Sequence, residues 1–283
     1  MIKWEDYIDH IYIVDYIKTD PQVTYKFNCE LLRIGINRNN TDFVTTFMNI
    51  NTPLYEVLFN KFNKSNTNDK YSYTFDCTFG HYYCMKLAQS KNYKRILILE
   101  NDGIYYDNLN TIENILYQMK IVFNDGSCDL FLGGSGCISL NGDKINYDDN
   151  YIYQINFKTF FAGATFNVYN DKAYNYFINY IENFNFNVID EYNQIYFHSG
   201  IKIWISNIPI CVQKNWDLTM VDLYKHYDMI CPDKNQIENA YHSANNFIWN
   251  DKRNQFKCIY DCLIHFNLEK EYKEIYQDCL NHI

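Results

Sequence analysis

The stretch that decides the fold is RILILENDG, residues 95–103. Four apolar residues end abruptly in Glu100, Asn101 and Asp102, and a glycine follows. A short run that is apolar on both faces is typical of a strand in the middle of a parallel sheet. In open α/β sheets, ligands bind outside the carboxyl ends of such strands. The stretch therefore predicts either a chain that leaves its core through a capped loop, or a strand that delivers oxygen ligands to a binding edge.

Helix and strand patterns alternate on both sides of this stretch. Repetition of this kind predicts a mixed α/β sheet with right-handed crossovers. The expected elements are a strand at 10–16, a helix from Pro21 to a stop at Gly35, a helix begun by Thr52 and Pro53, a helix at 78–90, a strand at 94–102, a helix at 110–123 with Asn110 and Glu113 as its capping box, and a strand at 128–134.

The pattern changes after the glycine-rich GGSGC, residues 133–137. Short aromatic strands at 150–169 predict an antiparallel extension, followed by a helix at 171–184, a short helix from Asp190, and a strand at 201–213. Two amphipathic helices, separated near Asn267, fill 253–283. We therefore expect a domain at 1–213 and a helical extension at 214–283. The extension is either a cap packed on the domain or a surface for a partner or a second copy of the chain.

Composition narrows the class of protein. The formal net charge of −9 disfavours a nucleic-acid binder, which needs a basic surface. No stretch approaches the ~20 apolar residues that span a bilayer, and acidic residues near the start argue against a secretory signal, so a cytoplasmic location is expected. The ten cysteines include no CxxC pair, and most of them are expected to be reduced and buried. The many aromatic residues suit sugar stacking, but the codons of an AT-rich genome, such as that of a large DNA virus, favour them as well.

A family resemblance lies in DCTFGHYYCMKLAQSKNYKRILILENDG, residues 76–103. It resembles the core signature of glycosyltransferase family 25, in which a cysteine and a Ser-His pair precede a helix and a strand ending in Leu-Glu-Asp-Asp. Cys77 takes the cysteine position, Gly80 stands at the serine, and His81 matches the histidine. The strand end matches at 99–102, with Asn101 in place of the first aspartate. IYIVDY, CDLFLGG and AGATFNVYNDKAYNYF resemble flanking family segments, so the likeness covers 8–213 in consistent order.

The resemblance implies a Rossmann-like nucleotide-sugar transferase fold of the glycosyltransferase A type. It also implies inverting, metal-dependent transfer of galactose or glucose from a uridine diphosphate (UDP) sugar to a hydroxyl on a glycan or on hydroxylysine. Glu100, Asn101, Asp102 and His81 are then expected to bind the donor, with Asp102 and Asn101 holding Mn²⁺ or Mg²⁺. Asp190 and Glu191 are the candidates for the base that deprotonates the acceptor, although Asp190 also suits a helix N-cap.

Several alternatives stay open at this point. His81 is a phosphate donor, a neighbour of the metal site, or a core histidine. His198 and His226 are further candidate metal ligands, and Gly133, Gly134, Gly136 and Gly163 either let the backbone approach the donor or simply form turns. Asn101, and the absence of the family's arginine after the first strand, favour a catalytically degenerate scaffolding subunit. A nucleotidyltransferase lacks its expected basic glycine-rich loop here.

Overall fold

The strand predicted from RILILE, β3 (Arg95–Glu100), lies inside a seven-stranded mixed sheet. This is seen in a computed structural model, which describes residues 2–15, 21–37, 41–45, 53–65, 70–101, 103–106, 108–134, 137–139, 151–154, 160–162, 164–187, 189, 195–196, 199–206, 210–213, 237–238, 241, 256, 259–260, 263–264 and 267–283. The strand order is β2-β1-β3-β9-β5-β10-β7. The other members are β1 (His10–Asp15), β2 (Asp42–Thr45), β5 (Leu130–Leu132), β7 (Ile152–Gln154), β9 (Phe166–Asn170) and β10 (Ile203–Ser206).

Strand directions make the sheet mixed, as the sequence predicts. β1 runs parallel to β2 and β3, and β5 runs parallel to β10. β9 is antiparallel to both of its neighbours, β3 and β5, and β7 is antiparallel to β10 at the edge. The expectation that the aromatic strands after residue 150 form an extension is therefore wrong for β9. This strand lies in the middle of the sheet because its four buried residues cover both faces.

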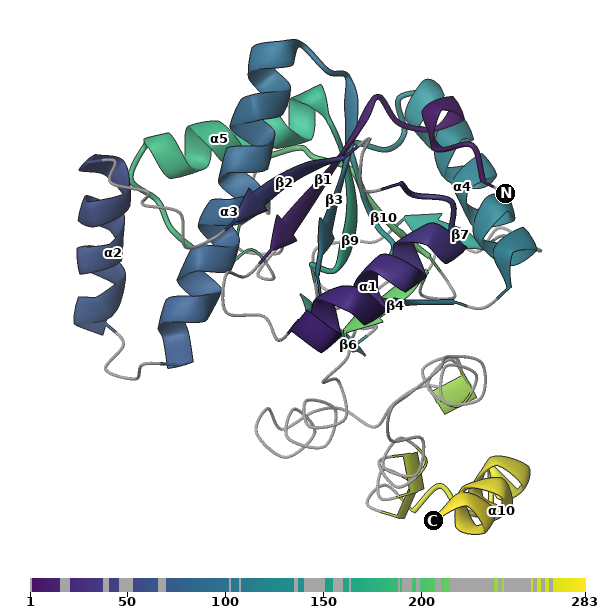
Figure 1. Cartoon of the computed structure of the whole chain (residues 1–283). Coiled ribbons are helices and arrows are strands. Elements are labelled where there is room, and N and C mark those ends of the chain that lie inside the picture. The colour runs from purple at the N-terminus through teal and green to yellow at the C-terminus, as the bar shows by residue number, and fades with distance from the viewer. Residues whose placement is uncertain are drawn as a thin grey trace.

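Alternate residues of the strands build two hydrophobic cores, one on each face. Ile11 and Ile13 of β1 join the core under α1 (Pro21–Arg33) and α4 (Leu109–Asn124). Tyr12 and Val14 join the core under α2 (Pro53–Ser65), α3 (Lys70–Lys91) and α5 (Asp171–Glu182). Figure 1 shows these two helical layers on either side of the sheet. The period of two along each strand thus explains why both faces need helices.

The helices begin and end largely where local signals place them. The stop predicted for α1 is confirmed: Gly35 has a positive φ of 84°, and Ile36 N–H bonds to Leu31 O at 2.8 Å. The capping box predicted for α4 is wrong, because the N-cap is Asn108, whose side chain accepts from the N–H groups of the second and third helical residues. α3 begins eight residues before the predicted Thr78.

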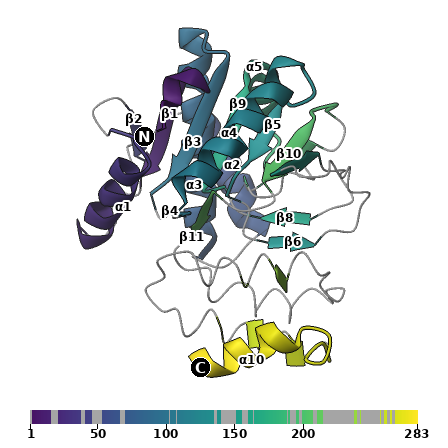
Figure 2. The ribbon, with the colours of Figure 1, turned by 90° about the vertical axis from the view of Figure 1, so that its right-hand side faces the viewer.

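Two small antiparallel sheets complete the strand list. β4 (Gly103–Tyr105) pairs with β11 (Cys211–Gln213), and β6 (Cys137–Ser139) pairs with β8 (Phe160–Ala162). The single strand predicted at 201–213 is therefore wrong, since β10 and β11 belong to different sheets. Two strands, β2 and β4, were not predicted from the sequence. Figure 2 shows both small sheets below the ends of the main strands, at the sheet's carboxyl edge.

The C-terminal residues contain the second of the two predicted helices, α10 (Lys273–His282). The predicted break near Asn267 is confirmed: its φ is 56°, and Leu268 N–H bonds to Leu263 O at 2.8 Å, as at a helix end. A separate hydrophobic cluster forms here, comprising Ile237, Phe256, Ile259, Leu263, Tyr272 and Cys279. Residues 214–236 lie outside the described part of the chain, so the division after residue 213 stays a prediction.

Two expectations from composition are met among the described residues. None of the helices described is long and apolar enough to cross a membrane. Six of the cysteines whose side chains the structure describes are free thiols, and all of these but Cys29 are buried; they are Cys29, Cys77, Cys84, Cys128, Cys211 and Cys279.

Candidate functional site

The topology creates a switch point between the carboxyl ends of β1 and β3. β2 lies on one side of β1, and the chain then returns to place β3 on the other side. Val14 of β1 is in register with Glu100 of β3, so Asp15, the last residue of β1, and Asn101, the first residue after β3, lie next to each other. Ligands of open α/β sheets bind at such a point because the two connections leave in opposite directions and open a crevice.

Asn101 is folded onto the end of β1. Its backbone N–H donates to Val14 O at 3.2 Å, and its side-chain amide donates to the Asp15 carboxylate. Only 3% of Asn101 is exposed. Asp102, the next residue, lies outside the described residues, so its role as a metal ligand stays a prediction. The sequence analysis missed Asp15, although the first strand also ends an apolar run in a carboxylate, as β3 does.

The Glu100 side chain lies on the face of the sheet that α3 covers, and two side chains of α3 contact it. Cys77 Sγ donates to Glu100 Oε1 at 2.9 Å, and His81 Nε2 lies 3.2 Å from the same oxygen. The side chain of His81 is 0% exposed and that of Glu100 is 8% exposed. His81 therefore contacts the strand end through Glu100, as a neighbour of the site or as a core histidine does. Direct contact between His81 and a phosphate stays a prediction.

Thr78, next to Cys77 on α3, fixes a distant segment of the chain. Its Oγ1 accepts a hydrogen bond of 2.9 Å from the buried N–H of Ile189. The two predicted catalytic carboxylates, Asp190 and Glu191, follow directly but lie outside the described residues. Their predicted roles remain open, but the chain enters that segment from a point bound to the same helix that carries Cys77 and His81. His198, His226, Gly136 and Gly163 also lie outside the described residues.

The glycines of this edge have a packing explanation. A Cβ on Gly134 would lie 2.3 Å from Thr165 Oγ1 and 2.8 Å from Phe166 N, and one on Gly133 would lie 2.6 Å from the Phe166 ring. These two glycines thus allow close approach of β5 to the strand beside it. Gly103 is confined in the same way, because its Cβ would lie 2.5 Å from Cys211 Sγ across the β4–β11 pair.

Arg33 forms hydrogen bonds with the backbone at the end of β4, the strand that follows β3 in the chain. It donates to Tyr105 O at 2.6 Å and to Tyr106 O at 3.1 Å, and it forms an ion pair with Glu30 at 2.8 Å. Glu30 also accepts from the Tyr105 N–H at 3.3 Å. Arg33, the first arginine after β1, is therefore engaged with the Glu30 carboxylate and with the carbonyl oxygens of Tyr105 and Tyr106, which joins α1 to the chain that follows the candidate site.

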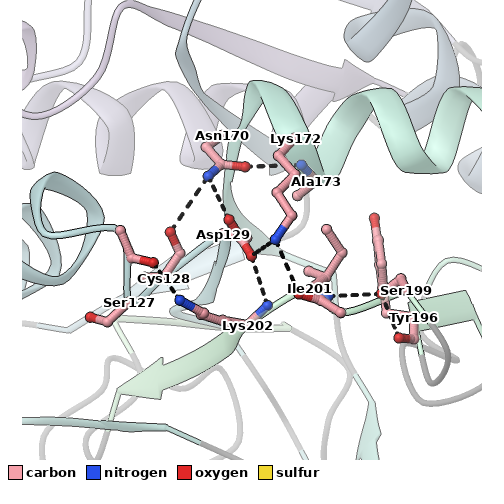
Figure 3. A network of polar contacts seen from close by, with 12 residues as sticks. Ser127, Cys128, Asp129, Asn170, Lys172, Ala173, Tyr196, Ser199, Ile201 and Lys202 are labelled. Carbon is pink, nitrogen blue, oxygen red and sulfur yellow. Dashed lines mark hydrogen bonds and ion pairs between the residues drawn. The ribbon is translucent and has the colours of Figure 1, made fainter.

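Asp129, from the segment that resembles the family's aspartate-containing strand, lies just before the start of β5 and therefore at the opposite edge of the sheet. Figure 3 shows the polar contacts that surround it. It accepts from Lys172 Nζ at 2.7 Å, from the Lys202 N–H at 2.9 Å and from Asn170 Nδ2 at 3.0 Å. Burial by itself raises the pKa of Asp129, but these donors together lower it below the ordinary value. Asp129 thus joins the starts of β5, β10 and α5, which is a structural role away from the switch point.

Two surface cavities also lie away from the switch point. One of about 340 Å³ is lined by residues that include Trp4, His10 and Ile36. The other, of about 320 Å³, lies beside Gln118 and Trp204. Neither contains Asp15, Glu100 or Asn101. The first cavity is also lined by polar residues, among them Glu5, Asp9 and His10. We place the candidate site at the switch point because Asp15 and Asn101 meet there at the carboxyl ends of two parallel strands.

The site can present oxygen ligands to a hard cation. Asp15 supplies a carboxylate, and the Asn101 amide, whose nitrogen donates to Asp15, offers its carbonyl oxygen. Mg²⁺ and Mn²⁺ prefer such oxygens and complete their shells with water and phosphate. No protein-family model matches the chain, and no curated protein matches it with significant similarity.

Proposed function

We propose that the chain is a metal-dependent inverting glycosyltransferase of the A-type fold. It transfers a hexose, galactose or glucose, from a UDP-sugar to a hydroxyl on a glycan or on a collagen-like protein. The observation that carries this proposal is the meeting of Asp15 and Asn101 at the switch point between β1 and β3. This is where a sheet of this kind binds a nucleotide, and Asp102 is the next residue.

In this proposal, Asp102 and the Asn101 carbonyl oxygen hold Mn²⁺ or Mg²⁺ against the donor diphosphate. The ion supplies charge neutralisation to the departing diphosphate, worth several kcal/mol at the transition state. Asp15 orients Asn101 through its amide, which directs the Asn101 oxygen away from β1. Glu100, bound by Cys77 and His81, fixes the end of β3 and with it the direction in which the donor-binding turn leaves the sheet.

Acceptor activation is assigned to Asp190 or Glu191. An inverting transfer needs a carboxylate on the acceptor side that removes the hydroxyl proton, which contributes about 10² to 10⁴-fold to the rate. The hydrogen bond from Ile189 N–H to Thr78 supports this assignment, because it starts the Asp190 segment beside α3 rather than at the far edge.

The test is a calorimetric titration of UDP into the purified chain, with Mn²⁺ and with chelator. Asp102→Ala is expected to abolish the Mn²⁺-dependent heat. Asp171→Ala is the matched control: Asp171 is a surface aspartate at the opposite edge, ion-paired to exposed Lys94 at 2.7 Å, and its loss is expected to leave binding unchanged. Screening UDP-galactose and UDP-glucose for turnover then identifies the sugar.

The same titration distinguishes a transferase from a scaffolding subunit. A folded chain that binds no UDP with Mn²⁺ contradicts the transferase proposal. It leaves the scaffolding alternative, in which the C-terminal helices contact a partner protein or a second copy of the chain. Binding that survives in Asp102→Ala would instead move the metal site to other residues.

A further inference from the structure

A second ligand set lies behind the strand end, on the α3 face. Cys77 and His81 are four residues apart on α3, so their side chains lie on the same face of the helix. Both point at Glu100, the last residue of β3. The ligand atoms of the three side chains all lie within 4.8 Å of one another, and all three residues are buried.

This set differs in chemistry from the oxygen ligands at the switch point. A thiol, an imidazole and a carboxylate are the three donor types that zinc takes in proteins, whereas Mn²⁺ and Mg²⁺ prefer oxygen. Zinc-ligand bonds of about 2.0–2.3 Å in a tetrahedron bring ligand atoms roughly 3.3–3.8 Å apart. To reach that spacing, the 2.9 Å and 3.2 Å contacts with Glu100 must widen, and the Cys77 and His81 ligand atoms, which lie within 4.8 Å of each other, must come to the same separation.

Charge and proton positions support an ion here. A thiolate, a carboxylate and a neutral imidazole balance a divalent cation, so the buried group carries no net charge. Binding moves the Cys77 proton to solvent. A neutral His81 that carries its proton on Nε2 before the ion binds must move that proton to Nδ1, a buried atom with no hydrogen-bond partner among the described residues. The reaction therefore releases one proton for each ion bound.

We propose that Cys77, His81 and Glu100 bind a zinc-class divalent ion, with water at the fourth position. Zinc sites that keep a position for water have three protein ligands, and the water is the fourth ligand. The ion joins α3 to the end of β3 through these three ligands. It thereby stabilises the position of Asn101, the residue that follows Glu100. The site needs neither a nucleotide nor Asp102, so it stands independently of the proposed function.

Cobalt is the probe, because Co²⁺ bound to a thiolate gives a charge-transfer band in the near ultraviolet. The full-length chain, stripped of metal and kept reduced, is titrated with Co²⁺. The expected result is a band that saturates at one Co²⁺ per chain and disappears when Zn²⁺ is added. Absence of the band in folded wild-type protein overturns the proposal without reference to any variant.

Variants assign the ligands. Cys77→Ser is expected to abolish the band, and Cys84→Ser is the matched control, since Cys84 is another buried thiol on α3 outside the cluster. If Cys77→Ser does not fold, His81→Gln serves the same purpose, with a weakened or shifted band expected. An unchanged band in either folded variant overturns the assignment. Asp102→Ala should keep the band, which separates this site from the proposed Mn²⁺ site.

Discussion

Replacing Asn101 by aspartate is the most informative single change at the switch point. The change looks harmless by sequence, since it restores the Asp-Asp pair of the resembled family. In the structure, however, the Asn101 amide donates to the Asp15 carboxylate, and Asn101 is only 3% exposed. Asn101→Asp therefore removes a donor and places two carboxylates at contact distance. At about 3 Å and an effective dielectric constant of about 20, their repulsion reaches roughly 5–6 kcal/mol.

The pair can limit this repulsion by binding one proton. At pH 7, protonating an aspartate of ordinary pKa about 3.9 costs about 4 kcal/mol, and at pH 5 it costs about 1.5 kcal/mol. The shared proton also restores a hydrogen bond between the two side chains. We therefore expect Asn101→Asp to lower the free energy of unfolding by about 4 kcal/mol at pH 7, with most of the loss recovered at pH 5. The free energy of unfolding of the variant falls as the pH rises because its folded state holds this proton more tightly than the unfolded chain does.

Urea unfolding followed by tryptophan fluorescence at pH 5 and pH 7, with chelator, measures this effect. Asn101→Ala is the control: it removes the donor without adding charge, and its cost of about 1–3 kcal/mol should not change over this pH range. If Asn101→Asp costs no more than Asn101→Ala and shows no pH dependence, the two side chains do not face each other. Added Mn²⁺ should stabilise Asn101→Asp more than Asn101→Ala if the ion binds at this turn.

Three further changes test the framework around the site. Asp129→Asn should lower the free energy of unfolding by about 2–3 kcal/mol at pH 7. Because the folded pKa of Asp129 is lowered from 3.8, its contribution is present above pH 3.8 and lost as the pH falls through the folded value, so urea curves of wild type and variant should converge as the pH is lowered below 3.8. Gly134→Ala should cost about 3 kcal/mol in the same assay, because its Cβ meets Thr165 Oγ1 and a neighbouring backbone nitrogen; a cost below 1 kcal/mol would mean that the strands are not so closely packed. Burial raises the pKa of Asp76, and the hydrogen bond from Tyr55 only partly opposes this. Ionisation of Asp76 therefore lowers the free energy of unfolding as the pH rises. The free energy of unfolding of Asp76→Asn minus that of wild type should be larger at pH 7 than at pH 4, and a smaller difference at pH 7 would contradict the burial of Asp76.

Local signals in the sequence predicted much of the secondary structure. The two-sided apolar pattern placed β3 inside the sheet, and the conformational freedom of Gly35 and the left-handed tolerance of Asn267 ended helices where expected. The N-cap of α4 was mispredicted because of a nearby competitor: Asn108 rather than Asn110 caps the helix, since its side chain reaches two free N–H groups at the helix start.

The oxygen-rich strand end, and the need for helices on both faces, were determined by the sequence, because they depend on residues close together in the chain. Only the tertiary structure decided which groups meet that end. A strand's apolar pattern says which face is buried but not which strand lies beside it. The pairing of β1 with β3 therefore brought Asp15 to Asn101, and the packing of α3 brought Cys77 and His81 to Glu100. Asp129 lies just before β5, and the direction of β5 in the sheet places it at the edge opposite the switch point. There Lys172 and Lys202 donate hydrogen bonds to it, which gives it a structural role.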